Sequence, residues 1–133
     1  SSDLSYEKRL VMYLQDLSVP KGTKVIMIGL NDACVHCLEF LLKAHRKNEA
    51  AFKSQKISYL FIGQSADQVL TSFNIPGEMV LIDEQKVYQQ FFTLEEQVLY
   101  PLIHYKEDGE VEVIIYDFRS CAKDLERFLE LRF

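Results

Sequence analysis

The sequence predicts an α/β fold in which a mixed β-sheet carries helices on both faces. Two observations lead to this prediction. Short apolar runs rich in β-branched residues alternate with helical patterns, and an antiparallel hairpin signal and a last helix then follow. The chain has 133 residues, of which 48% are hydrophobic and 26% are charged. This length is sufficient for a hydrophobic core, and we expect a single domain over residues 1–133.

The first half of the chain alternates between helical and strand patterns. We expect a helix over about 3–17 with Asp3 or Ser5 as its N-cap, a strand over 24–29, a helix from 34 to about 52, a strand over 57–62, and a short helix over 66–73. A break at 18–22 and a turn at 74–77, both holding Pro and Gly, separate these elements.

The second half contains shorter elements. We expect a strand over 79–82, a helical turn or two over 87–92, hairpin strands over 99–105 and 110–116, and a helix over 121–133. The dipeptide Asp108-Gly109 between the two hairpin strands is a strong hairpin signal.

The composition excludes several classes of function. Fifteen Lys and Arg against twenty Asp and Glu give a net charge of −5, which does not favour nucleic acid. No apolar run approaches the roughly 20 residues of a membrane span, and Ser1-Ser2-Asp3 does not open a targeting segment. Three cysteines are an odd number, so a framework of paired structural disulfides is not expected.

The most informative feature is Cys34-Val35-His36-Cys37, which lies between a predicted strand and a predicted helix. Unpaired N–H groups and the positive end of the helix dipole meet at such a junction. A thiolate there is stabilised, so thiol pKa values in such motifs fall from about 8.5 to about 3.5–7.5. The pattern therefore predicts thiol–disulfide exchange.

Two alternatives apply to this cysteine pair. The cysteines are merely packed, or they form an inert disulfide on a scaffold used for binding. A zinc site would need two more ligands, and the other soft candidates show no second C-x-x-C and no H-x₃-H spacing. These candidates are His36, His45, His104 and Cys121. No metal is therefore expected.

Two segments together resemble the thioredoxin-like superfamily. The first is the strand, Cys34–Cys37 and helix; the second is Tyr100–Val111, which resembles the family's proline-initiated strand, charged turn with Gly, and returning strand. The stretch Val80–Phe91 resembles the extra strand and helix of the TlpA/ResA-like branch of thiol–disulfide oxidoreductases. The resemblance implies a three-layer thioredoxin-like fold with this insertion and an N-terminal helix.

The resemblance also implies the roles of the site residues. Cys34, nearest the helix N-terminus, is expected to attack as the thiolate, and Cys37, one turn into the helix, to resolve the mixed disulfide. Val35, His36, Tyr100 and Pro101 are expected to contact the substrate, with Pro101 in the cis form against the cysteines. From the residues alone, Pro101 is equally a simple strand-start proline.

His36 places positive charge near the Cys34 thiolate when protonated, which makes the disulfide more oxidising. DsbA-like members of the superfamily have His at the same position. The expected partners are protein thiols or disulfides and an electron-donor or acceptor protein, with no cofactor beyond the dithiol. The resemblance implies an extracytoplasmic setting.

Three positions depart from the family pattern. Ala33 replaces the common tryptophan before the first cysteine, Ile28 replaces a buried acid, and Tyr100 is bulkier than the usual residue before the proline. These departures favour the rival hypothesis of a thioredoxin-fold binding or accessory domain with little redox activity. A peroxidase is a third hypothesis, which the Asn31-Asp32-Ala33 sequence before Cys34 does not favour.

Two further residues, Cys121 and His104, are of types that carry out chemistry. Cys121, at the start of the last predicted helix, is either a third reactive thiol or a small buried residue. His104, in the middle of a predicted strand, is expected to be a core or a half-exposed histidine with a hydrogen-bond partner.

Overall fold

The computed structural model describes residues 4–28, 35–63, 65, 67–68, 75–97, 99–116 and 119–130. For residues 35–38, 100, 116, 121 and 130 it describes only the backbone. The helices in these ranges are α1 (Tyr6–Asp16), α2 (Val35–Lys47), α3 (Glu49–Ser54), α5 (Tyr88–Phe91), α6 (Leu94–Gln97) and α7 (Cys121–Glu130), with a 3-10 turn η1 (Gly77–Met79). The strands are β1 (Thr23–Ile28), β2 (Ile57–Ile62), β3 (Val80–Asp83), β4 (Tyr100–Tyr105) and β5 (Val111–Tyr116).

The five strands form one sheet in the order β3-β2-β1-β4-β5. β1, β2 and β3 are parallel, whereas β4 is antiparallel to both β1 and β5. The prediction of an α/β fold with a mixed sheet is therefore confirmed.

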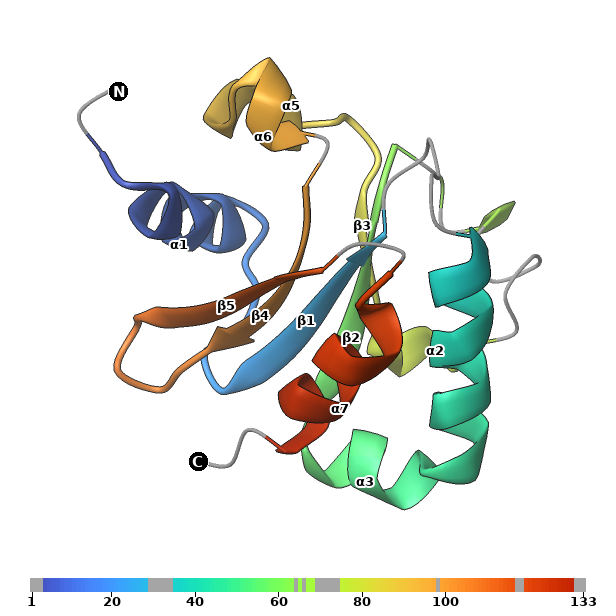
Figure 1. Cartoon of the computed structure of the whole chain (residues 1–133). Coiled ribbons are helices and arrows are strands. Elements are labelled where there is room, and N and C mark those ends of the chain that lie inside the picture. Colours follow the sequence, from blue (N-terminus) through green and yellow to red (C-terminus); the bar gives the residue numbers. More distant parts are fainter. Residues whose placement is uncertain are drawn as a thin grey trace.

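Helices cover both faces of this sheet (Figure 1). One face packs against α1 and α5, and its buried cluster includes Leu14, Val25 and Ile103. The other face packs against α2, α3 and α7, and its cluster includes Ile26 and Phe128. Val25 and Ile26 point to opposite faces because successive side chains alternate along a strand.

Local chemistry explains where the first helix begins. The Ser5 hydroxyl accepts a hydrogen bond from the backbone N–H of Lys8 at 3.2 Å, so Ser5, one of the two predicted N-caps, is the cap of α1. Burial of Leu10, Tyr13 and Leu14 then fixes α1 on the sheet.

The helix predicted from residue 34 to about 52 is wrong in its continuity, because it breaks at Asn48. The backbone of Asn48 has φ −132° and ψ 38°, and its side-chain amide donates to the Ala44 carbonyl at 2.9 Å. An asparagine side chain that donates to a helix carbonyl competes with the backbone N–H groups that would continue the helix. The break separates α2 from α3 and lets α3 turn back toward β2.

The helix α6 was not predicted, although a local signal for it exists. The Thr93 hydroxyl accepts from the N–H of Glu96, and the Glu96 carboxylate accepts from the N–H of Thr93, which forms a capping box.

The helix predicted over 66–73 lies outside the described residues except at Asp67 and Gln68. No helix in the described part of the chain is long and apolar enough to cross a membrane.

Candidate functional site

The candidate site lies at one edge of the sheet, which we name the carboxyl edge. It is the edge where the parallel strands β1, β2 and β3 end. Because Tyr100 pairs with Tyr116, β4 begins and β5 ends at this same edge. At the carboxyl edge, β1 ends before α2, β4 begins, and β5 ends before α7.

The cysteine motif belongs to this edge through α2. The helix begins at Val35, the residue directly after Cys34, so Val35, His36 and Cys37 form its first turn. Cys34 itself lies outside the described residues, as do the side chains of Val35, His36 and Cys37. The predicted strand before the motif and the predicted helix after it are confirmed as β1 and α2, while the chemistry of the two sulfur atoms stays a prediction.

Pro101 is the second residue of β4 and is buried. The paired register of β1 and β4 reaches Ile26 with Leu102, so Pro101 and Tyr100 continue toward the carboxyl end of β1. The Tyr100 side chain lies outside the described residues. The described residues contain no cis peptide bond, so the expected cis bond before Pro101 gains no support.

Ile28 is the last residue of β1 and packs, partly buried, against the apolar cluster beneath α2, α3 and α7. The side chain six residues before Cys34 is therefore a hydrocarbon. A methyl-bearing side chain takes no proton from a neighbouring thiol, and this removes one route of thiol activation.

The structure adds a buried carboxylate that the sequence reasoning missed. Asp124, in the first turn of α7, is 8% exposed and accepts a hydrogen bond from the Ser120 hydroxyl at 2.6 Å. Arg127 lies 3.6 Å from the same carboxylate. A serine directly before the helix and an acid in its first turn, four residues later, are the local signal for this contact.

Cys121 is the first residue of α7, which follows the end of β5 at the carboxyl edge. Helix α7 contacts α2. Its side chain lies outside the described residues. The two interpretations of Cys121, a third reactive thiol or a small buried residue, therefore both stay open.

The candidate zinc ligands His45 and His104 have other surroundings. The Nδ1 atom of His45 lies 2.8 Å from the Tyr59 hydroxyl, and its ring stacks on Phe52 with 4.7 Å between centroids. His104 lies in β4, in cross-strand register with Lys24 and Glu112. Burial lowers the pKa of both histidines, which keeps them neutral at pH 7. Among the described residues, no group of three side chains is arranged to hold a metal ion.

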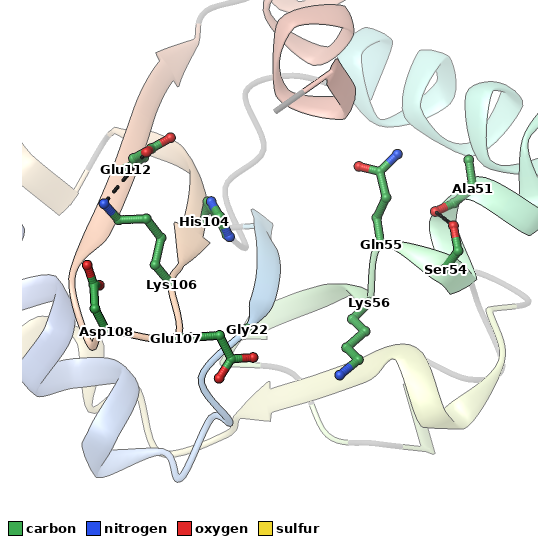
Figure 2. Close-up of a pocket in the computed structure, with 10 residues that line it drawn as sticks. All are labelled: Gly22, Ala51, Ser54, Gln55, Lys56, His104, Lys106, Glu107, Asp108 and Glu112. Carbon is green, nitrogen blue, oxygen red and sulfur yellow. Dashed lines mark hydrogen bonds and ion pairs between the residues drawn. The ribbon is translucent and has the colours of Figure 1, made fainter. Parts of the chain in front are cut away.

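A cleft of about 860 Å³ lies away from the carboxyl edge, where β1 and β2 begin (Figure 2). Figure 2 shows His104 between side chains of the β4–β5 hairpin and side chains at the end of α3. The hairpin contributes Lys106, whose ammonium lies 3.7 Å from the Glu112 carboxylate. The cleft is lined by Gly22, Ala51, Ser54, Gln55, Lys56, His104, Lys106, Glu107, Asp108 and Glu112. None of these described lining residues belongs to the predicted cysteine site.

Comparison with known proteins does not assign this chain to a protein family. No protein-family model matches this chain, and no curated protein matches it. The class that the fold and the site define is therefore an α/β protein with a five-stranded mixed sheet and a cysteine motif at the start of a helix.

Proposed function

We propose that this protein is a thiol–disulfide oxidoreductase of the thioredoxin-like superfamily, which exchanges disulfides with protein substrates through Cys34 and Cys37. One observation carries the proposal. The helix α2 begins directly after Cys34, at the edge of the sheet where β4 starts with Tyr100 and Pro101.

The arrangement of elements supports the thioredoxin-like assignment. The strand β1 leads through the motif into α2, and the proline-initiated strand β4 returns as β5 through the charged turn at Gly109. The strand β3 and helix α5 lie within Val80–Phe91, the stretch that resembles the TlpA/ResA-like insertion. These are the three segments on which the family resemblance rests.

The proposed exchange needs only the two thiols and a substrate disulfide. The Cys34 thiolate attacks one substrate sulfur, forms a mixed disulfide and releases the other substrate sulfur as a thiolate. The Cys37 thiolate then attacks the Cys34 sulfur, which forms the Cys34–Cys37 disulfide and releases the second substrate thiolate. Two electrons pass from the protein to the substrate, and a partner dithiol returns them.

The surroundings of the motif set its reactivity. The free N–H groups of the first turn of α2 stabilise a thiolate at Cys34, and a protonated His36 adds to this effect. Because Ile28 accepts no proton, we expect the Cys37 thiol to lose its proton to solvent or to the leaving thiolate.

Substitution of the cysteines tests the proposal. Cys34→Ser is expected to abolish the reduction of insulin disulfides, because the attacking sulfur is lost. Cys37→Ser is expected to accumulate a mixed disulfide with the substrate, which mass spectrometry detects as an adduct at Cys34. Cys121→Ser is the matched control, since it also removes one thiol, and it is expected to retain turnover. Normal turnover by Cys34→Ser would end the proposal.

The reduction potential of the pair decides the direction of electron flow. Equilibration in glutathione buffers near −270 mV, as in thioredoxin, would assign a reductase, and a value near −120 mV, as in DsbA, an oxidase. We favour an extracytoplasmic setting, which the TlpA/ResA-like resemblance implies.

The second candidate function is a thioredoxin-fold binding or accessory domain. The specific observation in its favour is Ile28, which packs against apolar side chains where an acid would assist exchange. A cysteine pair that does not equilibrate with glutathione, together with a Cys34 pKa near the free value of about 8.5, would select this candidate.

A further inference from the structure

The corner formed by the end of α2, by α3 and by the turn into β2 differs in charge from the remainder of the chain. Residues 43–56 hold five Lys and Arg against one carboxylate, Glu49. The other residues hold ten Lys and Arg against nineteen Asp and Glu. We name this set the basic corner; it consists of Lys43, Arg46, Lys47, Lys53 and Lys56.

All five side chains of the basic corner are exposed. None of them lies within 4.0 Å of a carboxylate in the part of the chain that the structure describes, whereas Arg9, Lys106 and Arg127 each form an ion pair there. The five cations thus form no ion pair with a described carboxylate, although Lys56 shares the cleft with Glu107, Asp108 and Glu112. The five cations are available to a partner.

Local stabilisation explains only part of this arrangement. Arg46 and Lys47 lie in the last turn of α2, and Lys53 lies in the last turn of α3, where cations interact favourably with the helix dipole. Each such contact contributes about 0.3–1 kcal/mol and requires a single cation per helix end. Lys43, a turn earlier in α2, and Lys56, beyond α3, lie outside these last turns.

The basic corner is separate from the proposed exchange site. Helix α2 rises about 15 Å between Cys37 in its first turn and Lys47 at its end, and about 9 Å between Cys37 and Lys43. Figure 1 shows α3 at the end of α2 that is opposite to its start. A partner bound at the corner therefore leaves the carboxyl edge accessible.

The chemistry of the corner selects one class of partner. The large hydrophobic side chains that are exposed in the described residues are Met12, Leu94 and Ile115, and none of them belongs to the corner. Insertion into a membrane interface or stacking on bases would use such side chains or aromatic rings. The net charge of −5 also repels an extended polyanion, whereas a short acidic segment stays within the local field, which is screened over about 8 Å.

We propose that the basic corner is a docking surface for an acidic segment, rich in Asp and Glu, of a partner protein. Carboxylates of the segment would pair with the exposed ammonium and guanidinium groups, and binding would weaken with salt. This inference goes beyond the exchange function and does not depend on it.

A labelled peptide of five glutamates, about 17 Å long when extended, is the probe, and fluorescence anisotropy at low ionic strength measures its binding to the full chain. The test variant Arg46→Gln/Lys47→Gln/Lys53→Gln removes three cations of the corner. The control variant Lys8→Gln/Lys86→Gln/Lys123→Gln removes three exposed cations elsewhere, so both variants carry the same net charge.

We expect the test variant to bind the peptide about tenfold more weakly, since three exposed ion pairs each contribute a few-fold. The control variant is expected to bind within about twofold of the natural chain. Absence of binding by the natural chain, or equal loss in both variants, would overturn the proposal. Tighter binding to anionic vesicles or to single-stranded DNA than to the peptide would overturn it as well.

Discussion

At the scale of single residues, two buried histidines make the fold sensitive to acid. His45 packs between Phe52 and Tyr59, and His104 lies in the sheet beside Lys24 and Glu112. Burial is the largest cause that lowers both pKa values; the charge of Arg46 also lowers the first, and those of Lys24 and Lys106 lower the second. Glu49 opposes the shift at His45, and Glu112 and Asp108 oppose it at His104.

Stability is therefore expected to decrease as the pH falls below about 6.5, the pKa of an unfolded histidine. Below that value the unfolded chain binds protons that the folded histidines do not, so the free energy of unfolding decreases by at most about 1.4 kcal/mol per pH unit and histidine. Urea unfolding at pH 7.5, 6.5 and 5.5 measures this slope. The variant His45→Gln/His104→Gln is expected to flatten it, and an unchanged slope in that variant would contradict the assignment.

At the scale of elements, helix α1 holds the segment between β3 and β4 on the sheet. The Arg9 guanidinium donates to both carboxylate oxygens of Glu96, at 2.5 and 2.8 Å, and to the Phe91 carbonyl at 3.1 Å. The hydroxyl of Tyr13 donates to Asp83 at 2.7 Å, and the same carboxylate accepts from the N–H groups of Val87 and Tyr88. One helix thus fixes both ends of the segment between β3 and β4.

Glu96→Gln is expected to lower the free energy of unfolding by about 1.5–3 kcal/mol, the range for hydrogen bonds to charged groups. Arg9 lowers the pKa of Glu96 to about 2, so the contribution is complete above the unfolded value of about 4.5 and is lost as the pH falls toward 2. Urea unfolding at pH 7 measures the effect. Glu95→Gln, at the exposed neighbouring position, is the control and is expected to change stability by less than about 0.5 kcal/mol.

At the scale of the whole molecule, one sheet joins two separate apolar clusters. Ile103 belongs to the cluster beneath α1 and α5, and Ile57 belongs to the cluster beneath α2, α3 and α7. These residues lie on opposite faces and on strands that are two positions apart in the sheet, about 9.6 Å. If both clusters unfold in one transition, substitutions in the two clusters should lower the free energy of unfolding by amounts that add.

Ile103→Val and Ile57→Val are each expected to lower the free energy of unfolding by about 0.5–1.5 kcal/mol, because each removes one buried methylene. The double variant should equal the sum within about 0.5 kcal/mol, with a single transition by fluorescence and by circular dichroism. Ile115→Val, at a position that is 43% exposed, serves as the control with a smaller effect. Two separate transitions would show that the two faces unfold independently.

Most elements of this fold were predictable because their signals are local. The strands near 24–29, 57–62 and 99–116 match β1, β2 and the β4–β5 hairpin, since β-branched runs and the Gly109 turn act over a few residues. Gly109 has a φ of +87°, which explains why glycine follows Asp108. The break at Asn48 was missed because a side-chain hydrogen bond, not the hydrophobic pattern, ends α2.

The candidate site was predictable only in part. The sequence by itself determined that Cys34 precedes a helix and that a proline begins the hairpin, since both depend on neighbouring residues alone. The tertiary structure decided that β4 lies between β1 and β5, which brings Pro101 to the end of the sheet that leads into α2. It also decided which distant side chains meet, such as Arg9 with Glu96 and His45 with Tyr59. Periodicity and caps extend over one or two turns, whereas strand order and long-range pairing arise only when both faces of the sheet are buried together.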